Sequence, residues 1–111
     1  MYRFIACLLL PLLIGAQLMP YNDYRCGSGE FSHALSYTST WLCDQIAMNQ
    51  CCMMHDACYA GCAFTQIECD DQFCMCLSSI VTNPLCQAII LPAHCNMVRL
   101  FGALFVCPMM G

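Results

Sequence analysis

The sequence predicts a small, mostly α-helical domain that is rich in disulfides and built on two antiparallel, disulfide-linked helices. Thirteen of the 111 residues are cysteine, far above the usage of an ordinary hydrophobic domain. Two segments without internal helix breakers carry cysteine pairs with the same seven-residue spacing. No segment shows the alternation of apolar and polar residues that is typical of a β-strand.

Residues 1–16 have the layout of a secretory signal peptide. A single basic residue, Arg3, precedes an apolar run that ends in two small residues. Cleavage near Ala16 removes Cys7 and leaves an even number of cysteines, which can pair completely. We therefore expect a secreted, extracellular protein with one domain over residues 17–111.

Composition argues against several classes of function. Residues 17–111 contain two arginines, no lysine and seven carboxylates. Nucleic-acid binding needs many cations to neutralise phosphates, so we expect no nucleic-acid partner. The same balance disfavours strong attraction to anionic membranes. The apolar stretch 89–106 is interrupted by Pro92, His94 and Arg99, so we expect no transmembrane segment.

The N-terminal half is expected to hold a loop followed by a helix. Residues 17–41 contain many Gly, Asn, Asp, Ser and Thr residues, which indicate a loop-rich lead-in. Residues 45–62 contain no Pro, and no Gly before Gly61, which predicts a helix that ends at that glycine.

Two further helices are expected after it. Residues 66–79 have a similar composition, and the pair Asn83-Pro84 marks the stop that follows them. Over residues 94–105 apolar side chains recur at three- and four-residue intervals, which favours a third helix.

The cysteine spacings suggest how the first two helices pack. Cys51 and Cys58 are seven residues apart, as are Cys69 and Cys76, so each pair lies on one stripe of its helix, about 10.5 Å apart. If the helices run antiparallel, Cys51 can meet Cys76 and Cys58 can meet Cys69. Two bridges would then hold the helix pair in register.

This arrangement selects one carboxylate as the partner of a histidine. His55 lies between the two bridges on the inward stripe, about level with Gln72. Asp70 flanks that stripe, whereas Asp71 falls roughly opposite it and is expected to be solvated. Helical geometry therefore selects Asp70 as the carboxylate that can reach His55. The other two histidines lack comparable partners and are treated as ordinary residues.

Three motifs add a resemblance to a known family. The first is the run Cys51-Cys52-Met53-Met54-His55-Asp56-Ala57-Cys58-Tyr59, and the second is Cys69-Asp70 with Cys76 six residues after Asp70. The third is Cys26-Gly27-Ser28-Gly29. Over about residues 24–78 the chain resembles secreted phospholipase A2, with its active-site helix, its second helix and its calcium loop. It is similar to the short divergent branch that includes the group XII enzymes and small invertebrate forms.

The resemblance implies an enzyme that hydrolyses the sn-2 ester of glycerophospholipids at a membrane or micelle surface. His55 would be the base that takes a proton from the attacking water, because imidazole titrates near neutral pH. Asp70 would hold the imidazole and stabilise its charged form, with Tyr59 as a hydrogen-bond support.

The resemblance also implies a Ca²⁺ site. Its ligands would be both oxygens of Asp56 and the backbone carbonyls of Arg25, Gly27 and Gly29, since calcium takes several oxygen ligands. The Gly27 N–H would donate to the oxyanion. Glu30 is a departure, because the family usually carries another glycine there.

The family pattern assigns one further disulfide, Cys26 to Cys52, and repeats the two pairs that helical geometry suggests. Sequence alone does not separate the pairings of the remaining six cysteines. These are Cys43, Cys62, Cys74, Cys86, Cys95 and Cys107.

Other interpretations of the same residues stay open. The chain can be a catalytically inactive phospholipase A2-like binding protein that acts on a receptor or membrane, or a plain scaffold or inhibitor. Cys51, Cys52, His55 and Cys58 are also zinc-ligand types, although an even cysteine count favours disulfides.

The apolar residues of the C-terminal third have two interpretations. By default they cover the helix pair and form the core. A subset can instead surround the active-site slot and bind a lipid surface, with zwitterionic lipids favoured by the acidic charge. The residues are Leu85, Ile89, Ile90, Leu91, Leu100, Phe101, Leu104 and Phe105.

Overall fold

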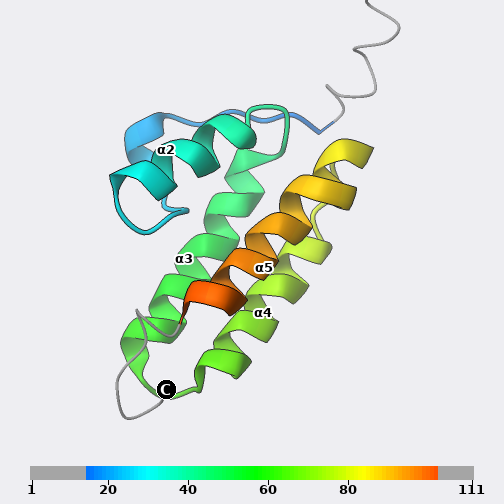
Figure 1. Cartoon of the computed structure of the whole chain (residues 1–111). Coiled ribbons are helices and arrows are strands. Elements are labelled where there is room, and N and C mark those ends of the chain that lie inside the picture. Colours follow the sequence, from blue (N-terminus) through cyan, green and yellow to red (C-terminus); the bar gives the residue numbers. More distant parts are fainter. Residues whose placement is uncertain (1–14, 103–111) are drawn as a thin grey trace, which may run out of the picture.

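The computed structural model describes residues 15–102 (Figure 1). The elements in order are the 3-10 helix η1 (Tyr21–Asp23), α2 (Glu30–Ser39), α3 (Gln45–Gly61), α4 (Gln66–Ser78), the π-helical turn η2 (Cys86–Ile90) and α5 (Leu91–Phe101). Residues 15–102 contain no strand beyond an isolated bridge between Gln17 and Asp44. The predicted mostly α-helical class is confirmed.

Helix α3 follows its expected bounds because both of its ends are capped. The Asp44 carboxylate accepts a hydrogen bond from the Ala47 backbone N–H, 3.0 Å away, which satisfies one of the free donors of the first turn. The helix ends at Gly61, as predicted. The residue that takes the left-handed conformation is Cys62, with φ of 57°, and not the glycine.

Helix α4 runs antiparallel to α3 after a short link (Figure 1). Its N-cap is Thr65, whose hydroxyl oxygen accepts from the Glu68 N–H and donates to the Glu68 carboxylate. The helix ends at Ser78, one residue before the predicted limit.

The disulfides expected between these helices are present. Cys51 bonds to Cys76 and Cys58 to Cys69, with Cα–Cα distances of 5.7 and 5.8 Å. The prediction of two antiparallel helices held in register by two bridges is therefore confirmed.

The other bridges join these helices to the rest of the domain. The bridge implied by the family, Cys26–Cys52, is also present, and the bridges whose pairing stayed open include Cys43–Cys86 and Cys74–Cys95. Cys62 is disulfide-bonded as well. Every cysteine in residues 15–102 is thus part of a disulfide bond. Because zinc binds thiolates, the zinc interpretation of the Cys51 segment does not hold.

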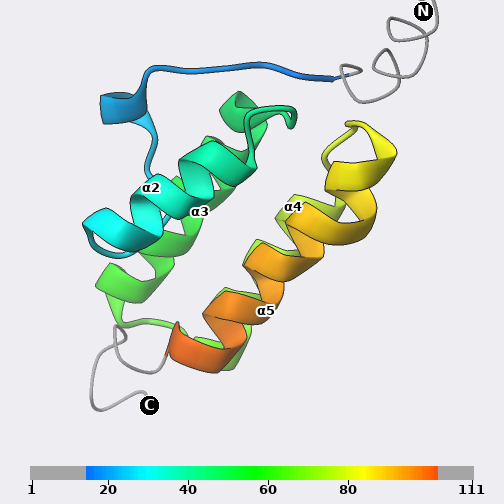
Figure 2. The same cartoon turned by 45° about the horizontal axis from the view of Figure 1, so that its top comes forward.

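Helix α5 lies along α4 and runs back in the opposite direction, as both views show (Figures 1 and 2). It begins at Leu91, earlier than the expected His94, because η2 leads directly into it and Pro92 lies in its first turn. The predicted helix runs past Gly102, so its expected end lies outside the described residues.

The prediction of a loop over residues 17–41 is wrong for Glu30–Ser39, which forms α2. Serine and threonine disfavour helices when their hydroxyls compete for backbone groups. In α2 the hydroxyls of Thr38 and Ser36 have hydrogen-bond partners. The Thr38 hydroxyl donates to the Ala34 carbonyl, and the buried Ser36 hydroxyl bonds to Tyr24 and His94, each 2.8 Å away.

Half-cystines make up nearly half of the core. The core contains Tyr24, Cys26, Cys43, Met48, Cys51, Cys52, Phe73, Leu77, Ile80, Cys86 and Leu91. The expected core role of the C-terminal apolar residues holds for Leu91 and for Ile90, which packs against the core. It is wrong for the four exposed residues Leu85, Ile89, Leu100 and Phe101. Leu104 and Phe105 lie outside the described residues.

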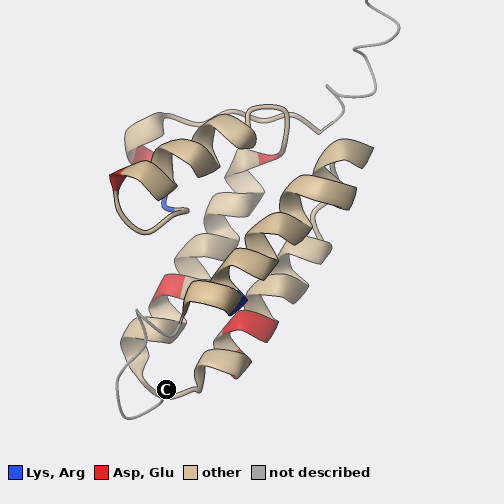
Figure 3. Cartoon of the chain, viewed as in Figure 1, with Lys and Arg blue, Asp and Glu red and all other residues tan. Residues whose placement is uncertain are grey.

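Charge is sparse on the helices (Figure 3). In α5 the only Lys, Arg, Asp or Glu residue is Arg99. Among residues 15–102, no helix has the length and apolar character needed to cross a bilayer.

Candidate active site

His55 of α3 and Asp70 of α4 form a buried pair. The His55 Nε2 atom lies 2.8 Å from Asp70 Oδ1, and the two residues are 6% and 2% exposed. The bridges Cys51–Cys76 and Cys58–Cys69 lie on either side of the pair and hold the two helices together. An ionised Asp70 accepts a hydrogen bond from the Nε2–H of neutral His55, which leaves Nδ1 as the nitrogen with a lone pair.

Tyr59 supports the same carboxylate. It lies one turn after His55 on α3, its hydroxyl donates to Asp70 Oδ1, and the two rings lie 4.2 Å apart. Burial first, and then the hydrogen bond to Asp70, raise the pKa of Tyr59. The phenol therefore stays protonated and remains a donor across the neutral range.

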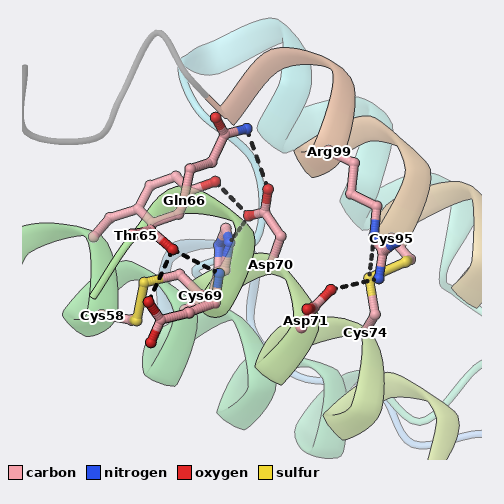
Figure 4. A network of polar contacts seen from close by, with 12 residues as sticks. Cys58, Thr65, Gln66, Cys69, Asp70, Asp71, Cys74, Cys95 and Arg99 are labelled. Carbon is pink, nitrogen blue, oxygen red and sulfur yellow. Dashed lines mark hydrogen bonds and ion pairs between the residues drawn. A yellow bond between two sulfur atoms is a disulfide. The ribbon is translucent and has the colours of Figure 1, made fainter. Parts of the chain in front are cut away.

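Gln66 and Phe73, which none of the sequence motifs singles out, complete the surroundings of the pair. Gln66 Nε2 donates to Asp70 Oδ2 at 3.2 Å (Figure 4). The Phe73 ring lies 4.6 Å from that of His55. Gln66 and Phe73 both lie within one turn of Asp70 on α4, the spacing at which helical side chains meet. The positions four residues before and three residues after Asp70 are therefore the sequence signal that could have identified these two residues.

Asp71 points away from the site, as helical geometry predicts, but it is not merely solvated. Its Oδ1 accepts a hydrogen bond from Arg99 Nη2 of α5 at 3.0 Å (Figure 4). Both side chains are about half exposed, so solvent weakens this ion pair.

The expected metal-loop residues Arg25, Gly27 and Gly29 line one open pocket together with Asp56. The pocket has a volume of about 990 Å³. Gly27 has φ of 100°, and a β-carbon there would lie 2.6 Å from the backbone of His33. Only glycine fits this turn.

Two contacts tie this loop to α3. The Cys26–Cys52 bridge joins them, and the Arg25 N–H donates to Asn49 Oδ1 at 2.6 Å. The loop is therefore anchored to the helix that carries both His55 and Asp56.

Two carboxylates, those of Asp56 and Glu30, are among the residues that line the pocket. Partial burial raises the pKa of Asp56, while the neighbouring charges of His55 and Arg25 act to lower it. Within residues 15–102 no group of three or more His, Cys, Asp or Glu side chains is placed so that it could hold a metal ion. A cation there would rely on backbone carbonyls, which calcium accepts and zinc seldom uses.

His94 is not the ordinary residue that the sequence suggested. Its Nδ1 donates to the Ile90 carbonyl at 2.8 Å, so Nε2 accepts from the Ser36 hydroxyl. Tyr24 extends this group, since its hydroxyl bonds to both Ser36 and Thr40. These contacts join α5 to α2. Burial lowers the pKa of His94.

The chain is similar to a phospholipase A2-like protein of Caenorhabditis elegans, with 33% identity over 101 residues. The similarity covers 85% of this chain and 58% of the relative, so the chain spans a little over half of that protein's length. No family model matches the chain, and no solved structure matches it. The comparison supports a phospholipase A2-like relationship.

Proposed function

We propose that the protein is a secreted, calcium-dependent phospholipase that hydrolyses the sn-2 ester of glycerophospholipids. The buried hydrogen bond between His55 and Asp70 is the observation that carries this proposal. His55 lies on α3 directly beside Asp56. Asp56 lines the same pocket as the loop Cys26-Gly27-Ser28-Gly29, called the glycine loop below. The proposed base and one carboxylate ligand are thus consecutive residues of one helix, and the proposed carbonyl ligands come from the loop anchored to it.

The chemistry follows from which nitrogen of His55 is already occupied. Nε2 is held by Asp70, so Nδ1 takes a proton from water as the water oxygen bonds to the ester carbonyl carbon. The ester C–O bond then breaks, and the imidazolium returns the proton to the leaving alkoxide. Asp70 stabilises the imidazolium during this step, and Tyr59 and Gln66 keep Asp70 oriented.

The residues at the pocket fit a calcium ion. Asp56 would hold it through its carboxylate, and Arg25, Gly27 and Gly29 through their carbonyls. When bound, Ca²⁺ polarises the ester carbonyl and neutralises the substrate phosphate. The Gly27 N–H would donate to the oxygen on which negative charge develops.

The same proposal includes that the protein is secreted and that it belongs to the short divergent branch of the phospholipase A2 family. The disulfides are consistent with an oxidising, extracellular compartment. The signal peptide over residues 1–16 lies almost wholly outside the described residues and stays a prediction. The compact link between Gly61 and Gln66 supports placement in the short divergent branch.

The test is a lipid-hydrolysis assay on residues 17–111 with Ca²⁺ and with a chelator. Fatty-acid release should require Ca²⁺ and should fall by about 10²-fold or more in His55→Gln and in Asp70→Asn. Asp71→Asn is the matched control and should keep its activity, since Asp71 faces Arg99.

Two outcomes would overturn the proposal. Equal activity of His55→Gln and the unchanged protein would remove His55 as the base. No Ca²⁺-dependent release by a correctly disulfide-bonded protein would favour the inactive phospholipase A2-like binding protein.

A further inference from the structure

Both oxygens of the Asp70 carboxylate are engaged, and from different sides. Oδ1 accepts from His55 and Tyr59 of α3, whereas Oδ2 accepts from Gln66 of its own helix. Asp70 is buried, and a buried carboxylate needs such donors in place of the water it has lost. Without Gln66, Oδ2 would lose a donor that fixes rotation of the carboxylate about its terminal bond.

Gln66 is suited to this position by its chemistry and its place. It is the first residue of α4, four residues before Asp70, so their side chains share one face of the helix. Figure 4 shows the two side chains pointing toward each other. A glutamine donates a hydrogen bond without competing with Asp70 for a proton, which a glutamate would do.

The C-terminal end of helix α5 lies against the contact between Gln66 and Asp70, at the C-cap residue Gly102. Gly102 is buried, and a β-carbon there would overlap the Tyr59 hydroxyl and lie 3.0 Å from Gln66 Nε2. The Cys74–Cys95 bridge fastens α5 to α4. The absence of a side chain at residue 102 thus lets α5 confine two of the donors to Asp70.

We propose that Gln66 is a positioning residue for the His55–Asp70 pair, and that the close approach of Gly102 keeps it in place. The reaction that this positioning serves rests on the proposed function. The hydrogen-bond arrangement itself can be tested without activity.

The first test compares Gln66→Met with Gln72→Met. Methionine keeps the length of the side chain and removes the N–H donor, and Gln72 is an exposed position on the same helix. The rate at which the His55 Nε2 proton exchanges with solvent, measured by NMR, should rise several-fold in Gln66→Met only. In the lipid assay kcat should fall about ten-fold with KM unchanged.

The second test approaches the same contact from α5. Gly102→Ala should speed exchange of the His55 Nε2 proton and lower kcat in the same way as Gln66→Met. Gly61→Ala is its control, because a β-carbon at Gly61 meets nothing within 4 Å. Circular dichroism and disulfide mapping show whether each variant keeps the fold.

Each result bears on one proposal. If Gln66→Met matches Gln72→Met in both proton exchange and kcat, Gln66 is not a positioning residue. If the unchanged protein releases no fatty acid while proton exchange still responds to Gln66→Met, the proposed function fails and the positioning role stands.

Discussion

At the scale of single residues, the orientation of the His55 ring in the candidate site depends on the side chains that contact it and its partner. One nitrogen of His55 is held by Asp70, and Tyr59 and Gln66 hold that carboxylate in turn. The contact between His55 and Asp70 is buried and the other two are partly buried, so water competes less for these atoms than it does at the surface. The strength of such hydrogen bonds depends on this reduced competition, since exposed groups exchange partners with solvent.

Tyr59→Phe tests the support on Oδ1. The change removes one donor to Asp70 and keeps the ring against His55, so kcat should fall about ten-fold while the fold persists. Steady-state kinetics on a lipid substrate would show it. Tyr37→Phe is the control, because Tyr37 donates to the Met19 carbonyl, away from Asp70. Equal losses in both variants would contradict a specific role for Tyr59.

Asp56→Asn tests the metal site separately from the base. The variant keeps its shape and loses the charged oxygen ligand, so calorimetric titration should show Ca²⁺ affinity lowered by about 10²-fold or more. The same titration of Asp71→Asn should match the unchanged protein. Undiminished Ca²⁺ binding by Asp56→Asn would place the cation elsewhere.

At the scale of elements, the helices are joined by disulfides and by hydrogen bonds between side chains. The bridges Cys51–Cys76 and Cys58–Cys69 hold α3 against α4. Ser36 and His94 join α2 to α5 by a hydrogen bond of 2.8 Å. The glycine loop enters α2 directly, at Gly29. The position of α2, and with it the rim of the pocket, therefore depends on α5 as well as on α3.

Removing Cys58–Cys69 should affect both stability and activity. Replacing both cysteines by Ala should lower the free energy of unfolding by about 2–4 kcal/mol. Activity should fall too, because Cys69 precedes Asp70 directly. Loss of Cys43–Cys86, which joins the start of α3 to η2, should lower stability with little change in activity. Denaturant titrations and lipid assays on both double variants compare these effects, and equal activity losses would contradict this local role.

His94 predicts how stability changes with pH. Burial lowers its pKa in the folded protein below the ordinary value of 6.5, so the unfolded chain binds the proton more readily. The folded state is therefore fully favoured above pH 6.5 and loses stability as pH falls from 6.5 through the lowered pKa. Denaturant titrations should show this slope in the unchanged protein, and a weaker slope in His94→Gln. An identical slope would show that another group causes it.

At the scale of the whole molecule, a core rich in half-cystines leaves many apolar side chains outside it. Phe31 and Leu35 of α2 are 81% and 56% exposed, and Phe31 lines the pocket that contains Asp56. Charged residues are few on the same helices (Figure 3). Such a surface favours contact with a neutral lipid interface over electrostatic attraction to an anionic one.

Phe31→Ser tests this surface. Hydrolysis of phosphatidylcholine vesicles should fall at least five-fold, because the side chain no longer buries apolar area in lipid. Hydrolysis of a short-chain lipid dispersed as monomers should not change. Val81→Ser is the matched control, since Val81 is 82% exposed and does not line the pocket. Parallel losses on vesicles and monomers would contradict an interfacial role for Phe31.

The sequence alone predicted the parts of the fold that depend on local periodicity. The seven-residue cysteine spacings determined the register of α3 and α4 and placed Asp70, rather than Asp71, beside His55. Tertiary structure decided the rest. A hydrogen bond from Ser36 to His94, 58 residues away, joins α2 to α5, and no local pattern reports a contact between residues so distant.

The same division holds at the site. The motifs identified His55 and the carboxylates near it. This was possible because residue spacing along a helix determines which side chains within two turns share a face. The approach of Gly102 to Gln66 and Tyr59, and the exposure of Leu100 and Phe101, depend on how α5 lies against α4. Disulfides already fill much of the interior, so α5 buries only part of its apolar surface, and composition alone does not indicate which part.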